Sequence, residues 1–121
     1  MDQEKVLSRI IQVADDRKAE RIEILKVDEF TTIADYFVIM AGNSTTQVKA
    51  IADTIEKKIK EEFGLLPHHV EGYASASWIL MDYSSVIVHV FLQETRQFYL
   101  LDNLWSDAKR IDIEQYIGKK D

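Results

Sequence analysis

Residues 36–63 constrain the fold of this chain more than any other stretch. Residues 36–41 (YFVIMA) form an uninterrupted apolar run, rich in aromatic and β-branched side chains. Such a run is typical of a strand that is buried on both faces of a sheet. A turn follows, and Ser44 with Gln47 has the spacing of a capping box at the start of a helix. We therefore expect a sheet that is covered by helices.

The helix predicted after Ser44 has one apolar face and two definite ends. Apolar residues recur three and four positions apart between residues 48 and 63, as in a helix packed on a core. Gly64 is a typical residue just beyond a helix end, and Pro67 prevents the helix from restarting.

The remaining elements complete a mixed α/β pattern. The sequence predicts a helix at 3–18, strands at 21–27 and 36–41, a weak or edge strand at 66–70, a hairpin of strands 78–82 and 86–92, a helical or turn-like segment at 97–104 and an amphipathic tail element at 111–117. The order α-β-β-α-β-β-β-α favours a mixed sheet flanked by helices. A chain of 121 residues fits one domain, covering residues 1–121.

Composition narrows the classes of function. The net charge of −6 and the pI of about 5.0 argue against free-standing binding of nucleic acid, which usually requires a basic face. The absence of cysteine excludes disulfides and thiol chemistry. The polar, acidic N-terminus is unlike a signal peptide, and no apolar run approaches the ~20 residues that span a bilayer. We expect a cytoplasmic protein with no membrane partner.

Residues 71–107 combine aromatic side chains with negative charge. Seven of the twelve aromatic residues fall here, and one arginine against five acidic residues gives a formal charge of −4. Such a surface suits phosphate poorly. It suits a basic protein, to which aromatic side chains supply buried contacts and acids supply charge complementarity. The simpler alternative, that most of these aromatics are core, stays open.

The histidines do not predict a metal site. His68 and His69 are adjacent, so in a strand they point to opposite faces. His89 has no carboxylate at ligand spacing, and no HExxH or cysteine cluster occurs. We expect no bound metal or cofactor, and we interpret His89 as a polar position on a half-buried strand face.

The turn at residues 42–44 raises a nucleotide hypothesis, because amides at a helix start can bind phosphate. The turn contains one glycine and no P-loop lysine. The acids nearby do not form the paired carboxylates that hold catalytic metal ions. A turn residue followed by a helix cap is the better interpretation, and we expect no enzyme. A residual nucleotidyltransferase using this turn with Asp35 or Asp82 is the alternative.

Four motifs together resemble the ribosomal silencing factor family, also called Iojap-like. They are ADYFVIMAGNSTTQVKAIADTIEKKIKE, an EG pair, WILMDYSSVIVHVF and RQFYLLDNLWSDA. The resemblance runs from about residue 7 to residue 108, with the motifs in the family's order and spacing. Two departures exist: Ser84 and Ser85 stand where the family has a Gly-acid pair, and Asp102 stands where Glu is more usual.

The resemblance implies a nucleotidyltransferase-like fold without catalytic residues. It also implies that the protein binds a basic protein of the large ribosomal subunit, the fourteenth in its series, at the face that meets the small subunit. Occupation of that face would block subunit joining and repress translation. A separate interpretation, drawn from the residues, is a self-associating module in which an exposed apolar hairpin or tail forms a two-fold homodimer interface. Marginal contact with ribosomal RNA stays open.

The candidate partner-binding residues follow from the aromatic, acidic segment and the resemblance. Aromatic and leucine side chains are the expected anchors, and charged residues set the electrostatic register. The candidates are Trp78, Asp82, Tyr83, Arg96, Phe98, Tyr99, Leu101, Asp102, Leu104, Trp105 and Asp107. Phe91, Leu100 and one of the two tryptophans are alternatives for the core.

Overall fold

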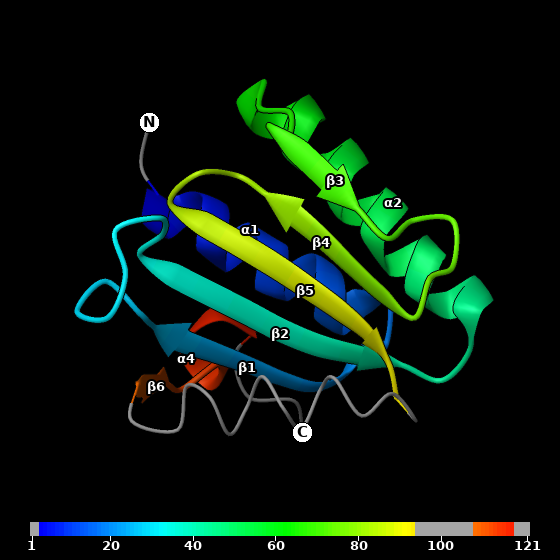
Figure 1. Ribbon diagram of the computed structural model, residues 1–121, viewed down its shortest axis with the longest axis horizontal. Coiled ribbons are helices and arrows are strands. Elements are labelled where there is room, and N and C mark those ends of the chain that lie inside the picture. Colours follow the sequence, from blue (N-terminus) through cyan, green and yellow to red (C-terminus); the bar gives the residue numbers. More distant parts are fainter. Residues whose placement is uncertain (1–2, 94–107, 118–121) are drawn as a thin grey trace.

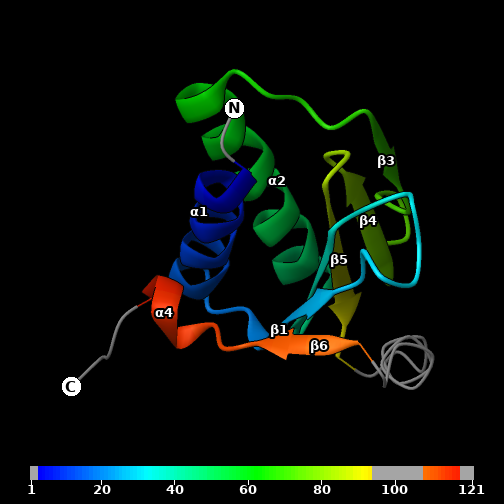
Figure 2. The ribbon, with the colours of Figure 1, turned by 90° about the vertical axis from the view of Figure 1, so that its left-hand side faces the viewer.

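The computed structural model describes residues 3–93 and 108–117, and these form a sheet with helices packed on one face (Figures 1 and 2). The elements are α1 (Gln3–Asp16), β1 (Glu20–Lys26), β2 (Tyr36–Gly42), α2 (Thr45–Phe63), β3 (His69–Glu71), β4 (Trp78–Asp82), β5 (Val86–Leu92), β6 (Lys109–Ile111) and α4 (Glu114–Ile117).

The sheet is mixed, as the sequence predicts. Its strand order is β3-β4-β5-β2-β1-β6. The β2–β5 pair at the centre is parallel, whereas the other four pairs are antiparallel. Among the described residues, the short strands β3 and β6 form the two edges of the sheet.

Two clusters of buried side chains fill the two faces of the sheet. The cluster on the helix side joins α1 and α2 to alternate residues of the central strands, including Val38 and Val88. The intervening residues, including Ile39 and Phe91, belong to the second cluster on the opposite face. Every residue of β2 is buried, which confirms the prediction of a strand covered on both sides.

The ends of α2 confirm the capping predictions, with one difference. Ser44 is the N-cap, and its Oγ accepts a hydrogen bond of 3.1 Å from the amide of Gln47. The Gln47 side chain accepts from the amide of Asn43 at 2.7 Å, one residue earlier than a capping box requires. Gly64 ends the helix with φ of 68°, and its amide donates to the Lys60 carbonyl.

Local geometry explains where two elements differ from their predicted bounds. The helix predicted over 3–18 ends at Asp16, because Lys18 adopts φ of 64° and closes a turn. The edge strand predicted at 66–70 lies at His69–Glu71 instead. Pro67 has no amide hydrogen for the ladder, and the backbone bonds to β4 begin with the amide of His68.

The C-terminal part of the described chain contains a strand that the sequence did not predict. Residues Lys109–Ile111 pair antiparallel with β1 as β6. The predicted element at 111–117 is helical over Glu114–Ile117 alone. The element predicted at 97–104 lies outside the described residues. None of the helices in the described segments has the length and apolar character that a membrane crossing requires.

Candidate functional site

The candidates that the structure describes lie on or beside β4. Trp78 and Asp82 are on the face of the sheet opposite the helices, together with Leu80. The same face continues on the neighbouring strands β3 and β5, because directly opposed residues in antiparallel strands point to the same side of the sheet. Leu80 is opposite Glu71 in β3 and opposite His89 in β5. We call Glu71, Trp78, Leu80 and Asp82 the β3–β4 surface.

Trp78 is half-buried and held in one orientation. Its ring stacks on Phe91 with the centroids 5.0 Å apart and an interplanar angle of 26°. Its indole Nε1–H donates a hydrogen bond of 3.1 Å to Nδ1 of His89. A large aromatic side chain that is both exposed in part and fixed by its neighbours has the character of a binding anchor.

His89 is the residue whose role the sequence missed. The sequence predicts a half-buried position for it, but its side chain is only 3% exposed, because Trp78, Phe37 and Phe91 surround the ring. Burial lowers its pKa from 6.5 to about 4, so the ring is neutral near pH 7. Because Nδ1 accepts from Trp78, Nε2 carries the proton, and Nε2 has no hydrogen-bond partner in the described structure.

Asp82 stabilises the β4–β5 hairpin. Its Oδ1 accepts a 2.7 Å hydrogen bond from the amide of Ser84, as in an Asx-turn. Ser84 has φ of 77°, in the region where glycine is favoured. Glycine would adopt this backbone conformation freely, whereas serine adopts it at a conformational cost.

Tyr83 lies in the core, in the cluster on the helix side of the sheet. Its side chain is 7% exposed, and its hydroxyl has no hydrogen-bond partner in the described structure. Burial and the nearby carboxylate of Glu56 raise the pKa of this phenol. The sequence predicts Tyr83 as an anchor, yet in this position it offers little surface to a partner. Phe91, the alternative core residue, is fully buried.

Eight predicted site residues lie outside the described part of the chain, and their partner contact stays a prediction. They are Arg96, Phe98, Tyr99, Leu101, Asp102, Leu104, Trp105 and Asp107.

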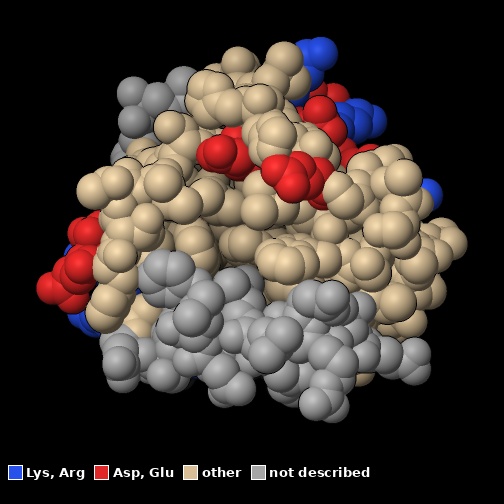
Figure 3. Space-filling view, viewed as in Figure 1, with Lys and Arg blue, Asp and Glu red and all other residues tan. Residues whose placement is uncertain are grey.

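The surface around the described candidates is acidic or uncharged. In Figure 3 acidic side chains lie over the β3–β4 side of the sheet, and the described lysines and arginines appear at the margins of this view. Three apolar side chains close to this surface in the sequence are also exposed: Leu66 at 55%, Val70 at 40% and Tyr73 at 42%. A surface of this kind is complementary in charge to a positively charged one.

The turn before α2 does not present a free phosphate cradle. The amides of Asn43 and Gln47 are both occupied within the chain, by Gln47 Oε1 and Ser44 Oγ. The Asn43 side chain donates to the carboxylate of Glu20 at 2.6 Å, which places a negative charge beside the turn. Across the described segments, no three His, Asp or Glu side chains gather as a metal site.

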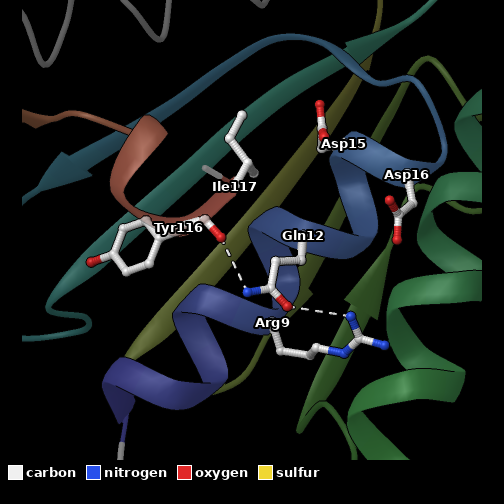
Figure 4. Close-up of a pocket in the computed structure, with 6 residues that line it drawn as sticks. All are labelled: Arg9, Gln12, Asp15, Asp16, Tyr116 and Ile117. Atoms are coloured by element: carbon white, nitrogen blue, oxygen red, sulfur yellow. Dashed lines mark hydrogen bonds between the residues drawn. The ribbon is translucent and has the colours of Figure 1, made fainter. Parts of the chain in front are cut away.

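A polar hollow of about 270 Å³ lies between α1 and α4, lined by Arg9, Gln12, Asp15, Asp16, Tyr116 and Ile117 (Figure 4). Gln12 donates to the Tyr116 carbonyl at 3.1 Å, and Arg9 donates to Gln12 at 3.4 Å. Arg9 also pairs with Glu62 of α2 at 2.9 Å. The Gln12 bond attaches α4 to α1, and the Arg9 pair joins α1 to α2, so the polar groups of this hollow hold the helices together.

The fold and the site define a mixed α/β domain with an acidic, aromatic sheet edge. The family model described as "Ribosomal silencing factor during starvation" matches residues 1–121. The chain belongs to this family of ribosomal silencing factors.

Individual relatives agree with the family match. The chain is 39% identical over 118 residues to the ribosomal silencing factor of Halalkalibacterium halodurans, covering 98% of this chain and 100% of that protein. A crystal structure of a Chromobacterium violaceum protein superposes with a TM-score of 0.81 at 31% identity, covering 88% of each chain. A mouse protein named "Mitochondrial assembly of ribosomal large subunit protein 1" is 28% identical over 102 residues, and the match spans 45% of its length.

Proposed function

We propose that this protein binds the fourteenth protein of the large ribosomal subunit at the face that meets the small subunit. The bound factor occupies that face, blocks subunit joining and so represses translation. Membership of the silencing factor family supports the regulatory role. The name of the mouse relative supports the large subunit as the site of action. The bacterial relatives at 39% identity support a cytoplasmic location for this activity.

The observation that carries the proposal is the β3–β4 surface. Trp78 provides a fixed, partly exposed aromatic ring, and the acids Glu71 and Asp82 lie on the same face. Ribosomal proteins that contact RNA are rich in Lys and Arg, so an acidic surface with an aromatic anchor complements them. Steric occupation requires only a stable complex, without turnover chemistry.

Two further parts of the proposal concern other partners. Contact with ribosomal RNA is marginal, because the net charge of −6 opposes close approach of phosphates. The free protein forms a homodimer through apolar surface exposed near the sheet edge, such as Leu66 and Val70. Light scattering over a concentration series measures whether the free protein forms this homodimer.

Replacing Trp78 by Ala tests the proposed surface. We expect Trp78→Ala to weaken binding to isolated large subunits by ~2 kcal/mol, since aromatic anchors dominate most interfaces. Co-sedimentation with separated subunits measures the affinity, and a subunit-joining assay measures the block. Thermal unfolding of the variant checks that the fold survives.

The matched control is Tyr73→Ala, which removes an exposed aromatic residue on the loop before β4. Tyr73 donates a hydrogen bond to Asp53 of α2, so its substitution should change affinity much less. Unchanged affinity of a folded Trp78→Ala variant would remove the β3–β4 surface from the interface. Failure of the native protein to bind large subunits, together with calorimetric binding of ATP and magnesium, would favour the nucleotidyltransferase alternative.

A further inference from the structure

A small depression of about 160 Å³ lies in the β3–β4 surface, lined by Glu71, Gly72, Trp78 and Leu80. Its lining combines an aromatic residue, Trp78, an aliphatic one, Leu80, and an acidic one, Glu71. An aromatic face, an apolar wall and one negative charge form a chemically specific combination. The depression belongs to the surface already proposed to bind the partner.

The backbone around the depression permits only glycine at residue 72. Gly72 has φ of 80°, and a Cβ added there would lie 2.0 Å from the carbonyl oxygen of Trp78. Its carbonyl also accepts from the amide of Ala76 at 2.9 Å, which closes the loop between β3 and β4. The close approach of this loop to β4 therefore keeps Glu71 beside Trp78.

Two buried side chains fix the orientation of the Trp78 indole ring. Nδ1 of His89 accepts the indole N–H at 3.1 Å, and Phe91 stacks beneath the ring. Both supporting residues are buried, so the ring has few alternative orientations. His89 is thus a positioning residue for the Trp78 wall of the depression, and it need not touch the partner itself.

Among the described residues, the Glu71 carboxylate has one ion-pair partner, a histidine. Glu71 contacts the imidazole of His69, two residues earlier on the same strand. No Lys or Arg of the described segments pairs with it, and its side chain is 64% exposed. A charged acceptor beside an aromatic face is available to a cation from outside.

We propose that this depression receives the guanidinium group of one arginine side chain of the partner protein. A guanidinium is planar, stacks on an aromatic face and pairs with a carboxylate through two N–H donors. Here it would lie on Trp78 and donate to Glu71, while its aliphatic part contacts Leu80. The inference rests on the proposed function for its biological partner, but the chemical preference of the depression can be measured separately.

The first test is a titration of the full chain with N-acetyl-arginine methylamide, followed by ¹⁵N nuclear magnetic resonance. We expect saturable shifts of the Trp78 indole N–H and of the Glu71 and Gly72 amides. The citrulline analogue, which has nearly the same shape without the charge, should produce no saturable shift. The Glu71→Gln variant should lose the response to the arginine compound. Equal responses to both compounds, or none to either, would overturn the proposal.

The second test compares Glu71→Gln with Glu61→Gln in binding to large subunits. Glu61 is an exposed residue of α2, on the other side of the sheet, so its substitution makes the same charge change away from the depression. We expect about tenfold weaker binding for Glu71→Gln and no change for Glu61→Gln.

The two tests separate this inference from the proposed function. If the native chain binds large subunits and both variants bind equally well, the arginine site is wrong and the proposed function stands. If the native chain does not bind large subunits but the arginine compound saturates the depression, the proposed function fails and the preference for a guanidinium stands.

Discussion

At the tip of the β4–β5 hairpin, Ser84 adopts a backbone conformation that suits glycine better than serine. Its φ is 77°, and a side chain in this region costs roughly 1–2 kcal/mol. The Asp82 carboxylate partly offsets the cost by accepting the Ser84 amide. A single residue thus carries strain that the adjoining strands tolerate.

Replacing Ser84 by Gly should therefore stabilise the protein. We expect Ser84→Gly to raise the free energy of unfolding by about 0.5–1 kcal/mol, after allowance for the greater freedom of glycine in the unfolded chain. Urea denaturation measures the change. Ser85→Gly is the control, because Ser85 is outside the set of residues with positive φ and should gain nothing. A loss of stability in Ser84→Gly would show that the serine side chain contributes to the turn.

His89 should make the stability depend on pH. Its pKa is about 4 in the folded chain against 6.5 ordinarily, so between these values the unfolded chain binds a proton that the folded chain does not. The contribution of neutral His89 to the free energy of unfolding is complete above pH 6.5 and declines as the pH falls toward 4. We expect a loss of about 2 kcal/mol between pH 7 and pH 5.

The variant His89→Leu isolates this effect, because leucine has no titrating group. Urea denaturation of both proteins at the two pH values should show a smaller pH dependence for His89→Leu. An identical dependence in the two proteins would mean that His89 is protonated as readily in the folded chain as in the unfolded one.

At the scale of elements, the connections decide how the strands and helices meet. Gln47 joins two helix ends, since its side chain accepts from the Asn43 amide and donates to the Lys18 carbonyl at 3.2 Å. The loop after β3 approaches β4 so closely that its backbone excludes any Cβ at Gly72. The packing of neighbouring elements, more than their own propensities, sets these geometries.

Two glycines with similar backbone angles should respond differently to alanine. Gly64 has φ of 68°, and a Cβ added there would meet no other atom within 4 Å, whereas a Cβ at Gly72 would meet the Trp78 carbonyl at 2.0 Å. We expect Gly64→Ala to cost about 1–2 kcal/mol. Gly72→Ala should cost clearly more, about 3 kcal/mol or above, because the loop must also move. Thermal or urea unfolding checks the order, and equal losses would contradict it.

At the scale of the whole molecule, charge is distributed so that one part of the surface suits a basic partner. The net charge is −6, and the acids of the β3–β4 surface face away from the helices. Long-range attraction to a basic protein follows from this arrangement, and it is screened by salt.

Binding to large subunits should accordingly weaken as the salt concentration rises. From about 50 to about 200 mM monovalent salt, we expect the affinity to fall roughly three- to tenfold, mostly through slower association. Co-sedimentation or surface-based kinetics measures the trend, with magnesium held constant to preserve the subunits. Affinity that is independent of salt, or increases with it, would assign the binding to apolar contacts.

The sequence by itself determined the elements whose signals are local. The capping pair Ser44 and Gln47 with Gly64 located α2, and the apolar run at 36–41 located the buried central strand. Local signals succeed here because capping, turn formation and periodic burial depend on residues close together in the chain.

Only the tertiary structure decided the features that depend on distant neighbours. β6 is a strand because its backbone pairs with β1. Tyr83 is a core residue because the helix layer covers it. His89 is a neutral, buried acceptor for Trp78 only because strands β4 and β5 align those two residues on one face. Pairing register and burial are set by the assembled sheet, and no local pattern of residues contains that information.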